Sequence, residues 1–331
     1  WQVRSGGAWV NCVAGDYPGA AVGAGTVNIL NGHTVTLTAS PANPIGALTF
    51  APGNIALSSV VFGGAWTLDI SGAVTYTLPG ANNNGDQTLN VGTGTLNCAS
   101  VTMVTTTDNA RIQTLSLSTG TVNVTGNVTM ATATQNAITF TGVGTLNIGG
   151  DFTPGTGTFT PSTGTVNYNG ANQNVAGLTY NNLTLSGTNN KTLQGNVTVN
   201  GNLNVSSGTL DFGNTVIRTV TVAGNLSGAG TIDMASGGSL AHQLTLNGTN
   251  NAIGSFVCGS GTVIYSRAGA QQIFAGTYYN LTTQTSNQVR TIQGDIIVNN
   301  NLTVTLGTFN FDNVAARNVV VNGNLSGAGT V

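Results

Sequence analysis

The chain has 331 residues, of which only 5% are charged, and its formal net charge is −2. All nine acidic residues are Asp, and Lys191 is the only lysine. The abundant Thr, Asn, Gly and Val are poor helix formers and favour strands and turns, so long helices are excluded. Nucleic acid is not an expected partner because there is no basic patch. No transmembrane segment is expected either, because no apolar run reaches 18 residues.

The first part of the chain, residues 1–55, repeats less clearly than the rest and carries Trp1, Trp9 and four of the seven prolines. We expect 1–55 to be an N-terminal cap or the start of a module, followed by repeats over 56–331, because repeat arrays cover the open edges of their first unit. The chain starts with Trp and has no basic and apolar leader. This start predicts either a removed signal peptide or a longer parent polypeptide.

Short runs of alternating apolar and polar residues follow along the chain, for example Thr121–Val124, Val197–Asn200 and Thr219–Val222. Such period-two alternation is typical of strands that bury one face. Most runs end at a Gly-Asn pair, where glycine supplies a positive φ and asparagine hydrogen-bonds its own backbone. The turn and ladder residues that we expect are Gly201, Asn202, Gly224, Asn225, Gly323 and Asn324.

The spacing of these turns defines a coil. Gly201 and Gly224 are 23 residues apart, which suits one turn of a parallel β-helix with two or three short strands. The predicted fold is therefore all-β, a right-handed parallel β-helix or β-solenoid with about 23 residues per coil. Like residues should stack from coil to coil, including an asparagine ladder at the turns.

A longer repeat lies over this period. Gly224–Thr231 returns as Gly323–Thr330, and Arg218 returns as Arg317, which gives a super-repeat of 99 residues. We expect four coils per super-repeat. Val331 aligns with Ile232, so the sequence stops partway through a unit. A repeat of fixed period buries each unit against the next.

Several segments resemble one group of secreted proteins. These segments include Tyr17–Gly19, Asn31–Leu37, Tyr180–Leu185 and Val199–Leu203. The chain is similar to large repetitive β-solenoid surface proteins, adhesin-like or fibrous, of Bacteroidota-type bacteria. The resemblance implies an extracellular or cell-surface location and a chain that is often part of a longer polypeptide.

Catalytic and metal-binding patterns are absent from the sequence. A polysaccharide-active enzyme would need paired carboxylates, whereas the nine Asp residues are dispersed singly. Asp211 and Asp233 are one coil apart and could stack, but turn formation is the expected role. His33 and His242 are too far apart in sequence to share a metal ion. Cys12, Cys98 and Cys258 form no CxxC motif, and buried free thiols are expected, with a disulfide as the alternative.

Two binding functions remain as alternatives. Tyr180, Tyr278 and Tyr279 recur once per super-repeat and are candidate contacts for a surface glycan, with packing over a coil corner as the alternative. Threonine arrays in β-helices can bind ice. Thr34–Thr38 and Thr156–Thr158 fit such an array locally, but the array does not persist in register along the sequence.

These observations favour a non-catalytic extracellular structural protein. We expect a rigid β-solenoid rod that forms part of a surface adhesin or of a fibre assembled by coil stacking. Its expected partners are further copies of itself, stacked head to tail, or the continuation of its own polypeptide. No cofactor is expected. A glycan-binding module and, after it, a β-helix polysaccharide-active enzyme are the alternatives.

Overall fold

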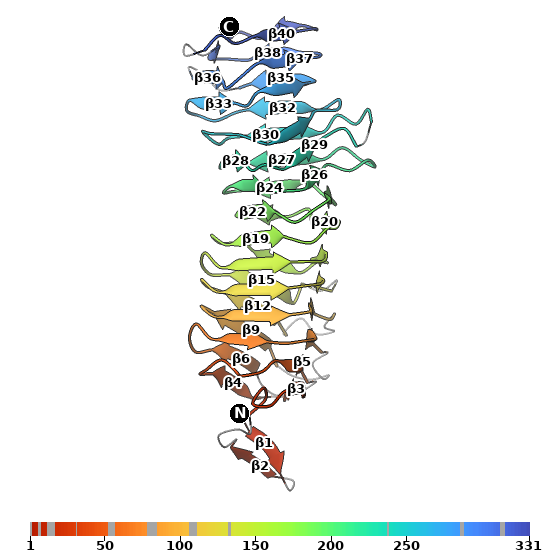
Figure 1. Ribbon diagram of the computed structural model, residues 1–331, viewed down its shortest axis with the longest axis vertical. Coiled ribbons are helices and arrows are strands. Elements are labelled where there is room, and N and C mark those ends of the chain that lie inside the picture. The colour runs from red at the N-terminus through yellow and green to blue at the C-terminus, as the bar shows by residue number, and fades with distance from the viewer. Residues whose placement is uncertain are drawn as a thin grey trace. The chain divides into compact units, whose positions relative to one another are not determined.

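The computed structural model describes residues 2–5, 8–11, 17–30, 32–51, 57–77, 85–105, 111–131, 134–236, 238–284, 288–311 and 315–331. All elements in these ranges are β-strands of two to six residues (Figure 1). Apart from one hairpin, every strand pair that joins them is parallel, which confirms the predicted β-solenoid. The chain divides into two compact units, Trp1–Thr165 and Val166–Val331, which are described separately below.

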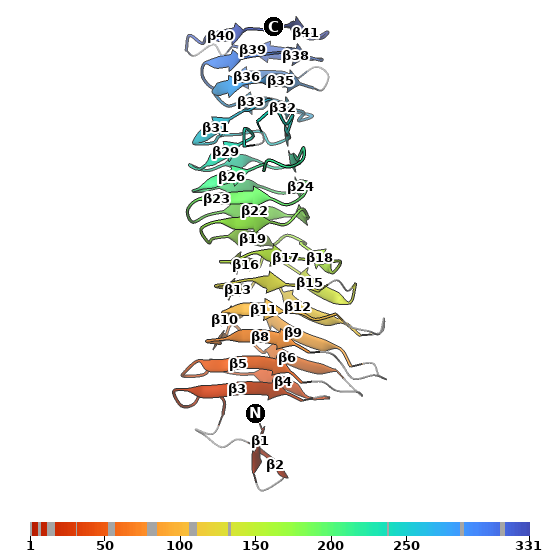
Figure 2. The same cartoon turned by 90° about the vertical axis from the view of Figure 1, so that its right-hand side faces the viewer.

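Unit 1 begins with the only antiparallel pair among the described strands, β1 (Gln2–Ser5) and β2 (Ala8–Asn11). The parallel coils follow, and each coil after the first contributes one strand to each of three sides (Figure 2). The β3 sheet contains β3 (Ala24–Ile29), β5 (Ile45–Phe50), β8 (Ala73–Tyr76), β11 (Ser100–Thr102), β14 (Val128–Thr129) and β17 (Phe152–Thr153). The β4 sheet contains β4 (Thr34–Leu37), β6 (Ser58–Phe62), β9 (Gln87–Gly92), β12 (Gln113–Leu117), β15 (Asn136–Phe140) and β18 (Thr158–Thr160).

The third side of unit 1 holds β7 (Thr67–Asp69), β10 (Thr95–Cys98), β13 (Thr121–Val124) and β16 (Thr145–Ile148) side by side. Parallel coils begin already at Ala24, where β3 pairs with β5. The boundary predicted at residue 56 is therefore too late, because strands within 1–55 stack as later strands do.

The interior of unit 1 is built by alternation. Along most of the parallel strands, one side chain in two points inward and is almost fully buried, and identical or similar residues stack in columns. One column joins Leu68, Leu96, Val122 and Leu146, which are partners in neighbouring strands. Burial of such apolar surface drives the fold and contributes about 25 cal/mol per Å².

Unit 2 repeats this plan from β19 (Thr165–Tyr168) onward. β19 is followed on its side by β22 (Asn182–Leu185), β25 (Leu203–Val205) and β28 (Leu226–Ser227). The β20 sheet holds β20 (Gln173–Val175), β23 (Asn190–Leu193), β26 (Thr209–Asp211), β29 (Thr231–Asp233) and β31 (Ser255–Val257). The β21 sheet holds β21 (Thr179–Tyr180), β24 (Val197–Val199), β27 (Thr219–Val222), β30 (Gln243–Leu246), β32 (Thr262–Tyr265), β35 (Asn280–Thr283), β38 (Leu302–Val304) and β41 (Leu325–Ser326).

Two short sheets complete unit 2. The β33 sheet holds β33 (Gln271–Ile273), β36 (Val289–Ile292) and β39 (Thr308–Asn310). The β34 sheet holds β34 (Gly276–Tyr278), β37 (Ile296–Val298) and β40 (Val319–Val321).

The two copies of the super-repeat do not place equivalent strands on the same side of the solenoid. Strand β22 and its equivalent β35 have nearly the same sequence, yet β22 follows β19, whereas β35 belongs to the β21 sheet. This change of side arises between β30 and β31. There the chain crosses one side of the coil without forming a strand, and Ala252 N–H donates to Leu226 O on that side. The second copy is therefore turned by one side of the three-sided coil. The expectation of four whole coils per super-repeat is wrong.

Candidate functional site

The tyrosines predicted as glycan contacts form an internal brace. Tyr180 is fully buried, and its hydroxyl donates to Ala176 O over 2.9 Å. The hydroxyls of Tyr180 and Tyr168 lie 2.9 Å apart, and Ala176 N–H donates to the Tyr168 hydroxyl over 3.2 Å. Burial raises the pKa of Tyr180 well above its usual value, so the phenol stays neutral. This closed set of bonds fixes a coil corner.

The second copy contains the same brace. The Tyr265 and Tyr278 hydroxyls are 3.1 Å apart, and Tyr278 donates to Phe274 O over 2.6 Å. Tyr278 is fully buried, and Tyr279 is half-buried. The prediction that Tyr180 and Tyr278 contact a glycan is therefore wrong, because neither ring reaches the surface; their recurrence reflects packing.

A buried cation is the second feature that both copies share. The Lys191 ammonium is fully buried in β23 and donates to three carbonyl oxygens, those of Gly170 (2.9 Å), Ala171 (2.6 Å) and Thr188 (2.7 Å). Desolvation by burial lowers the pKa of Lys191. The ammonium thus joins the loop before β20 to the loop before β23.

In the second copy Arg290 takes this place, as the second residue of β36. Its guanidinium donates to Gly269 O (3.0 Å), Arg267 O (2.5 Å) and Gln284 O (2.9 Å), which lie in the two equivalent loops. Arg290 is 1% exposed. Lysine and arginine therefore perform one structural task, and neither side chain is presented to a ligand. The sequence already indicates this equivalence, because Lys191 and Arg290 are 99 residues apart, which is the length of the super-repeat.

The predicted asparagine ladder at the turns is present in both copies. Asn202 Oδ1 accepts the backbone N–H of Asn225 over 2.9 Å, one coil later. Asn301 Oδ1 accepts the backbone N–H of Asn324 over 3.4 Å in the second copy. The positive φ predicted for the turn glycines is wrong, since Gly201, Gly224 and Gly323 lie outside that region. Glycine is required there because space is lacking: a Cβ on Gly224 would collide with Gly201 O. These turns therefore join each coil to the next.

The stacked carboxylates have a local explanation. Asp211 and Asp233 are register partners in β26 and β29, and neighbouring strands lie about 4.8 Å apart. Asp211 Oδ1 accepts Gly213 N–H and Asp233 Oδ1 accepts Ala235 N–H, both over 2.7 Å. Each carboxylate thus closes the turn two residues on, as Asp commonly does. The equivalent of Asp211 in the second copy is Asn310, which lacks a carboxylate.

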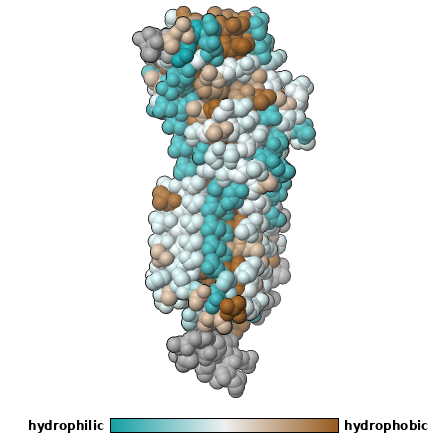
Figure 3. Space-filling view, in the orientation of Figure 1, coloured by the Kyte–Doolittle hydropathy of each residue, from teal (hydrophilic) through white to brown (hydrophobic). Residues whose placement is uncertain are grey.

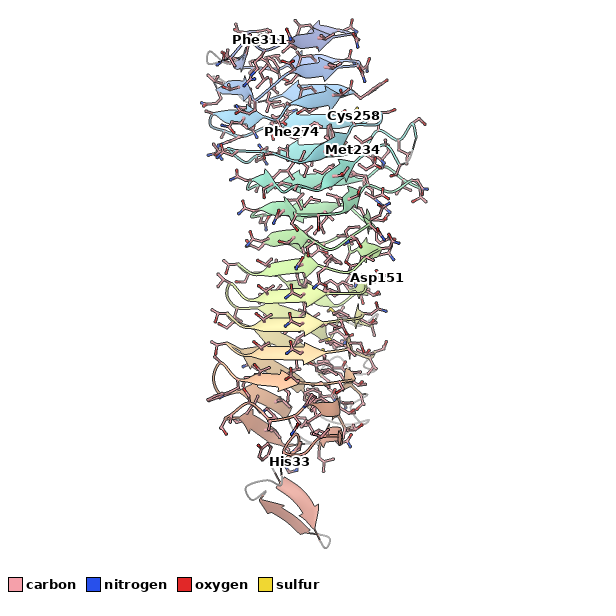
Figure 4. The ribbon with its side chains drawn as sticks, in the orientation of Figure 1. His33, Asp151, Met234, Cys258, Phe274 and Phe311 are labelled. Atoms are coloured by element: carbon pink, nitrogen blue, oxygen red, sulfur yellow. The ribbon has the colours of Figure 1, made fainter. Side chains whose placement is uncertain are left out.

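His242 is buried in unit 2 and is structural in its contacts. Its Nδ1 accepts the backbone N–H of Arg218 (3.0 Å), its Nε2 lies 3.2 Å from Gly213 O, and its ring packs 5.4 Å from that of Phe212. The Nδ1 bond fixes the neutral tautomer with the proton on Nε2. Burial lowers the pKa of His242 below its usual value. His33 precedes β4 in unit 1 (Figure 4).

The cysteines in the described residues are free. Cys98 is buried in β10, and burial raises its thiol pKa to about 12. Cys258 follows β31 beside buried Met234 (Figure 4), and burial raises its thiol pKa as well. The prediction of free thiols is confirmed for this pair, and Cys12 lies outside the described residues.

Within the described part of the chain, His, Cys and Asp form no group of three that could hold a metal ion. The same part contains no helix able to span a membrane.

One polar surface in unit 1 is regular in two dimensions. We call the outward side of β7, β10, β13 and β16 the Thr/Asn face. Two columns of side chains run along this face in register. The first column consists of threonines, namely Thr67, Thr95, Thr121 and Thr145. The second consists of Asp69, Asn97, Asn123 and Asn147. Figure 3 shows a continuous hydrophilic stripe along this part of the molecule.

The second column is tied together by side-chain hydrogen bonds. The Asn97 amide donates to Asp69 Oδ1 over 2.6 Å, Asn123 donates to Asn97 over 2.7 Å, and Asn147 donates to Asn123 over 2.7 Å. Sequence reasoning did not find this face because its rungs are unevenly spaced: Thr67, Thr95, Thr121 and Thr145 are 28, 26 and 24 residues apart. Strand pairing, and not sequence distance, sets the register.

The apolar end of unit 2 differs from its counterpart in the first copy. Phe311, Leu325 and Val331 are 37%, 57% and 50% exposed. Their equivalents Phe212, Leu226 and Ile232 are at most 1% exposed because the next coil lies over them. His242 packs on Phe212, Ala252 bonds to Leu226 and Phe256 is the register partner of Ile232. Figure 3 shows hydrophobic side chains gathered at this end.

Comparisons of this chain with protein-family models, with curated proteins and with solved structures found no match.

Proposed function

We propose that this protein is a non-catalytic structural component of the cell exterior, a rigid β-solenoid within a surface adhesin or fibre. The proposal rests on the features that both copies of the super-repeat share. The tyrosine brace, the buried cation and the asparagine turns recur. The first two are buried and the turns lie at the surface, but all three bond neighbouring loops and coils of the chain to one another. A repeat that preserves bonds between its own coils serves stacking.

The mechanism is mechanical. Each coil is hydrogen-bonded to the next along parallel strands and adds inward apolar residues to a continuous core. Outward Thr and Asn keep the surface hydrated with few charges. Solenoid stability of this kind grows with each added interface, which suits a long load-bearing element.

The apolar end of unit 2 supports assembly by stacking. We propose that a further coil of the same type covers it, since a coil with this chemistry covers the equivalent residues in the first copy. Burial of an exposed leucine or phenylalanine side chain contributes about 1.5–3 kcal/mol. The covering coil belongs either to a second copy or to the same polypeptide.

Sedimentation velocity over a wide concentration range tests the second-copy form. We expect concentration-dependent growth for the wild-type chain, abolished by Leu325→Lys, whose side chain would place a charge in the contact. Val320→Lys is the matched control, because Val320 is the equivalent of outward Thr221 and should not enter the contact. A wild-type chain that stays monomeric at high concentration would contradict self-stacking. Antibody labelling of intact source cells, compared with permeabilised cells, tests the extracellular location.

A further inference from the structure

The Thr/Asn face has a geometry that no structural role requires. Its strands already stack through backbone hydrogen bonds and inward apolar columns, as do the other sides of unit 1. On this side both outward columns are uniform. The β3 sheet has one uniform threonine column, from Thr49 to Thr153, but the column beside it is mixed, with Ala73 next to Ser100. On the β4 sheet the column through Thr88 and Thr114 continues with Ala137. A ligand that matches this face would itself be a regular two-dimensional lattice.

The spacing of the face follows from strand geometry. Neighbouring rungs are about 4.8 Å apart, and the Thr and Asn of one rung, two residues apart, are separated by about 6.6–6.8 Å. Both distances are close to repeat distances between equivalent water molecules on faces of hexagonal ice. A protein surface with this spacing can hold a layer of water molecules in positions that continue into a crystal.

The hydrogen-bonding groups are held in place before any ligand arrives. The ladder fixes the amides of Asn97 and Asn123, each of which uses one N–H and one oxygen lone pair in it. An amide has two N–H groups and two lone pairs, so each of these rungs still presents a donor and an acceptor to water. Threonine is stiff at χ1, and its methyl and hydroxyl keep fixed positions. Little side-chain entropy is therefore lost on binding.

The borders of the face leave room for a flat ligand. Residues 63–66, 93–94, 118–120 and 141–144 precede the four strands on one side, and residues 70–72, 99, 125–127 and 149–151 follow them on the other. A planar surface can therefore approach all four strands together.

From this regular array we propose that the Thr/Asn face binds ice, by ordering a water layer that matches the ice lattice. A flat crystalline polysaccharide is the competing ligand. The face favours water, because its two columns offer small hydroxyls, amides and one carboxylate and contain no aromatic ring, and partly exposed Trp66 adjoins only the first rung, that of Thr67.

Ice-affinity partitioning of the 331-residue chain tests the proposal. The protein is labelled, a solution is slowly frozen onto a cold surface, and the fraction in ice is compared with that of the liquid. We expect the wild-type chain to enter ice and Thr121→Tyr to be largely excluded. A bulky ring in the middle of the array lifts neighbouring rungs from the crystal, and a loss of at least about tenfold corresponds to about 1.4 kcal/mol.

Thr114→Tyr is the matched control, since Thr114 points outward from β12 on the same coil but belongs to the β4 sheet. It should enter ice as the wild-type chain does. Circular dichroism and thermal unfolding confirm that both variants fold. Exclusion of the wild-type chain, or equal behaviour of the two variants, would overturn the proposal. Binding of the wild-type chain to crystalline cellulose or chitin, lost in Thr121→Tyr, would overturn it in favour of a polysaccharide.

Discussion

Removal of one hydroxyl from the tyrosine brace tests whether the repeated tyrosines are structural. In Tyr180→Phe the ring still fills its site, but the donor to Ala176 O and the partner of the Tyr168 hydroxyl are lost. Both partners are buried. A buried polar group deprived of its partner costs about 1–3 kcal/mol. We therefore expect a loss of about 2–3 kcal/mol in the free energy of unfolding, measured by urea denaturation.

The effect should be local and should recur in the second copy. Hydrogen exchange measured by mass spectrometry should show faster exchange around the brace, since solenoids open in local units. Tyr278→Phe should lose a similar amount, because it removes the donor to Phe274 O. Tyr279→Phe is the control: Tyr279 is half-buried, and a change of at most about 0.5 kcal/mol is expected. Equal stability of Tyr180→Phe and the wild-type chain would refute the brace.

Three further predictions concern other internal groups. Lys191→Met should destabilise unit 2 by about 2–3 kcal/mol in urea denaturation, because three carbonyl oxygens lose their donor; Lys191→Arg should lose less, as Arg290 performs the same task in the second copy. The stability of the wild-type chain should fall as the pH drops below about 6.5, because folding lowers the pKa of His242 and the folded state therefore binds this proton less readily than the unfolded state. The fall should end once the pH is below the lowered pKa. Denaturation curves of His242→Gln, measured over the same pH range, should lack this step. Gly224→Ala should lower the thermal midpoint, because its Cβ would collide with Gly201 O, and an unchanged midpoint would show that the turn can relax.

Much of the fold follows from local sequence. The alternation in Thr219–Val222 predicts a strand with two inward valines, and both are buried. The Gly-Asn turns at Gly201 and Gly224 predict the coil length, because few residue types accept both the crowding and the hydrogen bonding found there. Long-range pairing in a solenoid joins neighbouring coils, so a sequence period is enough to predict which strands stack.

The sites were harder to predict because they depend on register across loops of different lengths. The Thr/Asn face joins residues 28, 26 and 24 positions apart, and no single period connects them. Burial was also misjudged. Tyr180 lies next to polar Asn181 and Asn182, as a surface residue would, but in a strand neighbouring residues face opposite sides. The inward direction of its ring is fixed by its register with Val199 in β24.

The second copy of the super-repeat is rotated by one side of the coil relative to the first, and this rotation limits which surfaces a super-repeat can build. Because equivalent strands such as β22 and β35 lie on different sides, an exposed group carried by the super-repeat would not form a straight column in successive copies. Internal braces tolerate this rotation, since each acts within one or two coils. A flat array does not tolerate it, and the Thr/Asn face is built instead from consecutive coils of unit 1, each with its own loop lengths. The super-repeat is therefore suited to extending the scaffold, while a surface for a lattice ligand has to be made within a single unit.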